Sequence, residues 1–172
     1  EFNNTTDRMI LANHTLKQLN IIDDNIMESK QYGKLSSILT LLNKCCTPMG
    51  KRKFQYKLTN PTFDMEWLNT EYVMTEMMLI DDNYAFVEHF RGQMKQIRDM
   101  EKMCRQLIVK KIYPSSIYQL YYGIIIIQQL NVCLEELPDM CDYLTKDIMG
   151  LQSGTQPNLY IEQETQSVIQ FL

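Results

Sequence analysis

The sequence has little glycine, little proline and no long apolar run, and each scarcity excludes a class of protein. Six glycines and five prolines in 172 residues leave long stretches without a helix breaker, which favours helices over a turn-rich sheet. The longest apolar run, Ile124 to Ile127, is far shorter than the ~20 residues of a membrane span. We therefore predict a globular helical protein with no membrane partner.

The sequence also lacks the common catalytic and nucleotide-binding motifs. Gly33-Lys34 and Gly50-Lys51 have neither the preceding glycine nor the following Ser/Thr of a P-loop, whose backbone N–H groups cradle phosphate. The two histidines, His14 and His89, have no partner at metal-ligand spacing. We expect that the chain is not an enzyme by itself, and we assign it no catalytic, cofactor-binding or metal-binding residue.

The cysteines and the net charge indicate where the protein is located and which partners it can bind. Five cysteines are an odd number, and no two form a C-x-x-C pair, so we expect reduced, mostly buried thiols in an intracellular protein. Nucleus, mitochondrion, bacterial cytoplasm and viral replication site remain open as locations. The net charge of −4 disfavours nonspecific DNA binding by the whole surface but allows a local basic patch.

Apolar residues recur at helical spacing along most of the chain. From Asp64 to Ile80 they form two opposite stripes, which is typical of a helix buried between layers, so we expect this helix to be central. The segment between Pro114 and Pro138 is predicted to be helical, although its four consecutive isoleucines alone would suggest a strand. The prediction is an all-α, multi-helix, bundle-like or orthogonal domain, with room for one short strand at residues 9–12.

The most informative stretch is Thr47-Pro48-Met49-Gly50. Thr47 is predicted to cap the N-terminus of a helix that begins with Pro48, where the missing N–H has no cost. Gly50 in the first turn suggests that another helix approaches closely. The helix is expected to end at Asn60-Pro61, because the residue before proline avoids helical angles.

A basic cluster formed by Lys51, Arg52 and Lys53 follows this junction. A solvated helix face explains it, and so does contact with nucleic-acid phosphate or an acidic neighbouring domain, since a helix N-terminus attracts anions. Few aromatic residues interleave with these cations, and the sequence leaves both explanations open.

The order and spacing of these pieces resemble the core, or lever, region (domain III) of MutS-type DNA mismatch-repair proteins. The resemblance spans about Met9 to Leu130, and Thr47-Pro48-Met49-Gly50 is its most specific part. A second matching stretch contains Asp99, Glu101 and Arg105, and the chain departs from the family pattern at Ala12-Asn13-His14. We treat both stretches as structural motifs without a chemical role.

The resemblance implies a lever that couples an ATPase domain, missing from this chain, to binding and clamping of mismatched DNA. It implies that ATP and Mg²⁺ belong to the full-length protein, with no cofactor in this chain. The implied partners are other MutS domains in the same polypeptide, DNA through the full-length protein, and a second subunit.

The expected organisation has three parts. Residues 1–8 read as a polar leader or the edge of an expressed fragment, residues 9–149 as the lever-like helical domain, and residues 150–172 as a loop and terminal helix without assignment. Two other functions remain open. One is a free-standing helical interaction module, and the other is a direct nucleic-acid-binding domain centred on residues 44–57.

Overall fold

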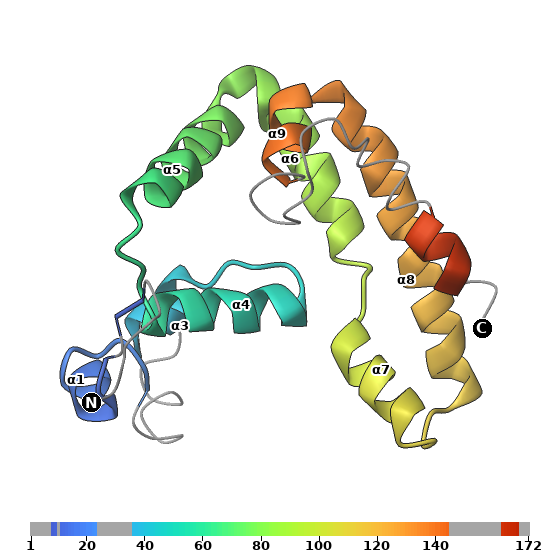
Figure 1. The fold of residues 1–172 in the computed structure, drawn as a ribbon, viewed down its shortest axis with the longest axis horizontal. Helices are drawn as coiled ribbons and strands as arrows, with labels where there is room; N and C mark the ends of the chain where they lie inside the picture. The colour runs from blue at the N-terminus through green and yellow to red at the C-terminus, as the bar shows by residue number, and fades with distance from the viewer. Residues whose placement is uncertain (1–7, 10, 24–35, 145–162, 169–172) are drawn as a thin grey trace. The chain divides into compact units, whose positions relative to one another are not determined.

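A computed structural model describes residues 8–9, 11–23, 36–144 and 163–168, and it is dominated by helices (Figure 1). The described helices are α1 (Asn13–Gln18), α3 (Ile38–Leu42), α4 (Pro48–Thr59), α5 (Met65–Leu79), α6 (Asp81–Met94), α7 (Met100–Ile108), α8 (Pro114–Cys133), the 3-10 helix η2 (Leu134–Glu136) and α9 (Pro138–Tyr143). Residues 163–168 are helical as well. The all-α prediction is confirmed.

The predicted N-terminal strand is wrong for those of its residues that the structure describes. Met9, Leu11 and Ala12 lie in no strand, and the antiparallel bridge between Arg8 and Thr62 is isolated. Two hydrogen bonds also hold this segment, from Met9 N to Pro61 O (2.8 Å) and from Arg8 Nη1 to Asn60 O (3.0 Å), but they do not extend the bridge into a strand. The loop expected at residues 150–158 lies outside the described residues.

The chain divides into two compact units, residues 1–68 and residues 69–172, with the boundary inside α5. In the first unit, the segment after α1 receives the start of α3 through two backbone hydrogen bonds, from Ile38 N to Asn20 O (2.9 Å) and from Leu39 N to Ile21 O (3.0 Å). The Ser37 side chain caps α3 by accepting from Thr40 N (3.2 Å). These bonds satisfy the free N–H groups at the start of a short helix.

The core of the second unit lies between α7 and α8, which run side by side (Figure 1). It is built from Met103, Leu120 and Ile124, with Met100 and Leu107 packed against it. Ile126 of α8 is the most buried of the large side chains, at 1% exposure. Pro114 begins α8, as predicted, because the fixed φ of proline suits the first helical position. Pro138, which was expected to kink or end a helix, begins α9 in the same way.

The expectation that the helix of residues 64–80 is central is wrong. α5 has no buried residue, and Tyr72 and Leu79 are 66% and 77% exposed. A doubly apolar helix becomes buried only where other segments cover both sides, and within the described chain they do not cover α5. The central helix is α8, which contains most of the buried side chains of the second unit.

α8 with η2, Pro114–Glu136, is long and apolar enough to cross a membrane by length and composition alone. The same test is passed by core helices of soluble proteins, and 39% of its most apolar stretch is buried inside the fold. The packing of Leu120 and Ile124 against α7 is that of a core helix. The expected absence of a membrane partner stays a prediction.

None of the five cysteines, all of which the structure describes, forms a disulfide, but the expectation that most are buried is wrong. Cys45, Cys46, Cys133 and Cys141 are partly exposed, and Cys104 is exposed. Adjacent positions on a helix point about 100° apart, so the turn of α7 that buries Met103 against α8 directs Cys104 toward solvent.

Gly123, buried in α8, supports a first testable prediction. A Cβ at this position would lie 4.0 Å from Ile97 Cγ2 and 4.0 Å from Met100 Sδ, an ordinary contact. Gly123→Ala should stabilise the second unit by roughly 0.5–1 kcal/mol, because alanine loses less backbone entropy in a helix. Urea unfolding followed by circular dichroism measures this change. Gly92→Ala, at an exposed helical position, gives the effect of helix propensity without any packing contact. A loss of stability would contradict the observed spacing.

Candidate functional site

The junction between α3 and α4 has the local structure that the sequence predicts. Thr47 occupies the N-cap position of α4, and its Oγ1 accepts a hydrogen bond from Gly50 N at 3.0 Å. Pro48 is the first helical residue, and α4 ends at Thr59 with Asn60 as its C-cap. Both helix ends therefore lie where the cap residue and the Asn60-Pro61 pair place them.

Asn43 fastens this junction from the preceding loop. Its Nδ2 donates to Lys51 O (3.2 Å), and its Oδ1 accepts from Cys45 N (3.3 Å). The side chain thus links the loop after α3 to the first turn of α4. Sequence reasoning missed Asn43, although asparagine between two helices is a common source of such side-chain to backbone bonds.

Gly50 is constrained by the junction itself. A Cβ built on Gly50 would lie 2.9 Å from Thr47 Oγ1 and 3.4 Å from Cys45 Cβ. The first distance is shorter than real Cβ contacts allow, so a larger residue must displace the capping hydroxyl. The sequence suggested that another helix approaches Gly50. In the structure, the residues close to Gly50 are instead its own N-cap, Thr47, and Cys45 of the preceding loop.

The basic cluster is exposed on α4, and Lys53 of the cluster and the nearby cations Arg8 and Lys57 lie close to aromatic rings. Lys53 Nζ is 5.9 Å and Arg8 Cζ is 5.5 Å from the centroid of the Tyr56 ring. Lys57 Nζ lies 4.5 Å from the Trp67 ring centroid. Helical spacing brings the Tyr56 ring to Lys53, and the chain turn at Pro61 brings the Trp67 ring to Lys57.

Cations beside aromatic rings have the chemistry of a nucleic-acid contact, but these cations and rings also stabilise one another within the chain. Each cation–π contact stabilises by about 0.5–1 kcal/mol at an exposed site. Lys51, Arg52 and Lys53 are all exposed, so their charges remain accessible to phosphate. Whether they contact phosphate stays a prediction.

The second predicted motif lies in the other unit. Asp99 caps α7, since its Oδ1 accepts from Lys102 N at 3.1 Å. Glu101 and Arg105 follow on exposed positions one turn apart. The structure thus gives Asp99 a capping role in the second unit, and the junction of Thr47, Pro48, Met49 and Gly50 a capping role in the first.

Comparison with known proteins gives a consistent result. The family model of MutS domain III matches residues 14–169, which extends past Leu130, where the resemblance seen in the sequence ended. A mutS-homologue DNA mismatch repair protein of Acanthamoeba polyphaga mimivirus is 31% identical over 118 residues, covering 66% of this chain and 10% of the relative.

Two further relatives agree. The mitochondrial DNA mismatch repair protein mutS homolog of Sarcophyton glaucum is 28% identical over 127 residues, covering 71% of this chain and 12% of the relative. The DNA mismatch repair protein MutS of Borrelia turicatae is 27% identical over 109 residues, covering 63% of this chain and 12% of the relative. The chain thus spans about a tenth of the length of the relatives it matches.

Proposed function

The chain belongs to the MutS family, in which it corresponds to domain III, and from this premise we propose that it is the structural core, or lever, of a MutS-like DNA mismatch-repair protein. In this proposal its helices couple an ATPase domain elsewhere in that protein to binding and clamping of mismatched DNA. The observation that carries the proposal is the match to domain III over residues 14–169.

The helix starts and the packed core support a mechanical role. α4 has a fixed beginning, because Thr47 caps it and Asn43 ties its first turn to the preceding loop. In the second unit, Leu120 and Ile124 pack α8 tightly against α7. Close-packed elements resist continuous deformation and move as rigid bodies, which is what transmission of a nucleotide-dependent motion requires.

The proposal assigns this chain no catalytic residue. ATP and Mg²⁺ are expected to bind other parts of the full-length protein, and no cofactor is expected here. The proposed partners are other MutS domains of the same polypeptide, DNA and a second subunit. The relatives include a viral, a mitochondrial and a bacterial protein, so an intracellular location is proposed without choosing among them.

The coupling role predicts a specific defect for Gly50→Leu in the intact protein. The added side chain displaces the Thr47 cap, so α4 loses its fixed start. ATP changes the lifetime of the protein on mismatched DNA by some factor in the wild type, and this factor should be about tenfold smaller in the variant. A tenfold loss lies within the usual range of coupling energies. Stopped-flow release from end-blocked mismatched DNA measures this lifetime.

Gly92→Leu is the matched control, because a Cβ at Gly92 would meet nothing within 4 Å. Binding of mismatched DNA without nucleotide should stay within about twofold of wild type in both variants, which separates lost coupling from lost folding. An unchanged ATP response in the Gly50 variant would count against the lever. The alternative of a free-standing interaction module predicts an open reading frame that lacks neighbouring MutS domains, which sequencing of the flanking DNA decides.

A further inference from the structure

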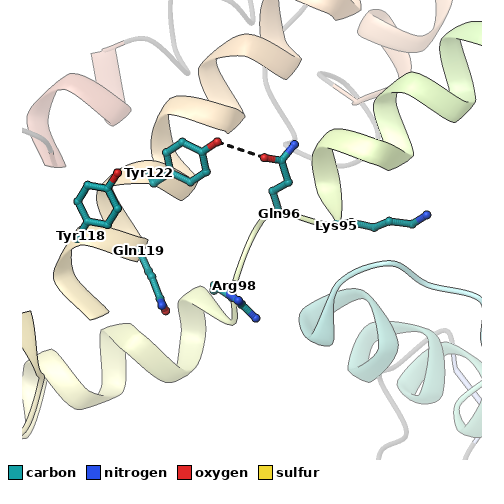
Figure 2. A pocket seen from close by; sticks show the side chains of 6 residues that line it. All are labelled: Lys95, Gln96, Arg98, Tyr118, Gln119 and Tyr122. Carbon is teal, nitrogen blue, oxygen red and sulfur yellow. Dashed lines mark hydrogen bonds between the residues drawn. The ribbon is translucent and has the colours of Figure 1, made fainter. Parts of the chain in front are cut away.

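The second unit contains a cavity of about 360 Å³ that none of the sequence motifs includes. Figure 2 shows its lining, which comes from the linker between α6 and α7 and from the first turns of α8. The lining residues are Lys95, Gln96, Arg98, Tyr118, Gln119 and Tyr122. Residues from two segments about 20 positions apart therefore meet at one site.

One hydrogen bond fastens the two walls of this cavity to each other. Tyr122 Oη donates to Gln96 Oε1 at 3.2 Å, as drawn in Figure 2. Gln96 Nε2 in turn donates to Gln93 Oε1 at 3.1 Å, at the end of α6. The amide of Gln96 is thus held from both sides, so the cavity does not need to be assembled when a ligand arrives.

One wall is an aromatic platform. Tyr118 and Tyr122 lie on successive turns of α8, with ring centroids 6.5 Å apart and ring planes within 10° of parallel. Tyr118 is 67% exposed and Tyr122 is 42% exposed. Two parallel, accessible rings offer flat apolar faces on which a planar ligand can stack.

The other wall is cationic. Lys95 and Arg98 are exposed on the α6–α7 linker, across Gln96 from the tyrosines (Figure 2). No carboxylate lines the cavity in the described part of the chain. The neighbouring acid in sequence, Asp99, directs Oδ1 to Lys102 N at the start of α7. Lys95 and Arg98 thus bring two cations to the cavity without a lining anion, although the Lys95 side chain extends away from the tyrosines in Figure 2.

We propose that this cavity binds one nucleotide of an unpaired nucleic-acid strand. The base stacks on Tyr118 and Tyr122, the adjoining phosphates contact Arg98 and Lys95, and the Gln119 amide is positioned to hydrogen-bond the sugar or the base edge. A flat ring joined to a phosphodiester is the chemistry that requires both walls. A phosphoserine peptide, which has no flat ring, would use only the cations. This site goes beyond the coupling role proposed above and does not depend on it.

The test uses the 172-residue chain and two fluorescein-labelled probes, octathymidine and an abasic strand of the same length. Tyr118→Leu should weaken octathymidine binding about tenfold and leave the abasic strand within about twofold, because stacking needs a base. Arg98→Gln should weaken both probes by similar factors. With two phosphates contacted, log Kd should rise with log salt at a slope of about 1.4. Fluorescence anisotropy measures all of these.

Matched controls lie on the same unit outside the cavity. Tyr84→Leu removes another exposed tyrosine, on α6, and Lys111→Gln another exposed cation; both should leave octathymidine binding unchanged. Equal losses in these controls would overturn the site. So would equal affinity for the two probes, displacement of octathymidine by a phosphoserine peptide, or loss of binding in Lys51→Gln/Lys53→Gln, which would assign the strand to α4.

Discussion

Leu120→Ala is expected to lower the free energy of unfolding of the second unit by about 3 kcal/mol, within the roughly 2–5 kcal/mol typical of buried leucines. Leu120 is 3% exposed and packs with Met103 and Ile124 between α7 and α8. Its truncation removes apolar burial and leaves a cavity that rigid neighbouring helices fill only in part. Urea unfolding followed by far-ultraviolet circular dichroism measures the loss.

The control is a leucine on α5, the helix that the sequence pattern predicted to be central and that the structure leaves exposed. Leu79 on α5 is 77% exposed, so Leu79→Ala should change the free energy of unfolding by no more than about 0.5 kcal/mol. The two substitutions delete the same atoms, and their difference therefore reports burial alone. Equal costs for the two would mean that α5 is a core helix after all.

Gly50→Leu is expected to destabilise the first unit by roughly 2–4 kcal/mol, the sum of a lost N-cap of about 1 kcal/mol and overpacking of about 1–3 kcal/mol. The Cβ would lie 2.9 Å from Thr47 Oγ1 and 3.4 Å from Cys45 Cβ. Trp67 is the only tryptophan of the chain and lies in the first unit, beside Lys57 of α4. Its fluorescence during urea unfolding therefore reports this unit.

A double substitution identifies the atom responsible. If the Thr47 hydroxyl constrains Gly50, then Gly50→Ala should be better tolerated after Thr47→Ala, with a coupling energy of about 0.5–1 kcal/mol. Additive effects would instead assign the constraint to Cys45. Gly92→Leu should be far milder than Gly50→Leu, because a Cβ at Gly92 meets nothing within 4 Å.

The helix boundaries were largely predictable because the residues that set them act locally. Thr47 accepts from an N–H three residues later, and Asp64 and Asp99 do the same for α5 and α7. Pro114 and Pro138 begin helices through their own fixed φ. A cap or a proline acts within about one helical turn, so sequence reading finds it without knowledge of the fold.

Burial was less predictable, since it depends on what lies opposite each face. α5 has apolar residues on two sides yet no buried residue, whereas α8 is covered by α7. The cavity between the α6–α7 linker and α8 joins Arg98 to Tyr118, a pairing without any local pattern. The cation–π contact between Lys57 and Trp67 likewise depends on how the chain turns after α4.

The sequence alone determined that this protein is helical, where most helices begin and end, and its likeness to MutS domain III, which the family comparison confirms. Tertiary structure decided which helix forms the core, which residues line the cavity, and that Lys57 meets Trp67. The reason is physical: capping and helix breaking are short-range, while burial and side-chain meeting depend on segments that are distant along the chain.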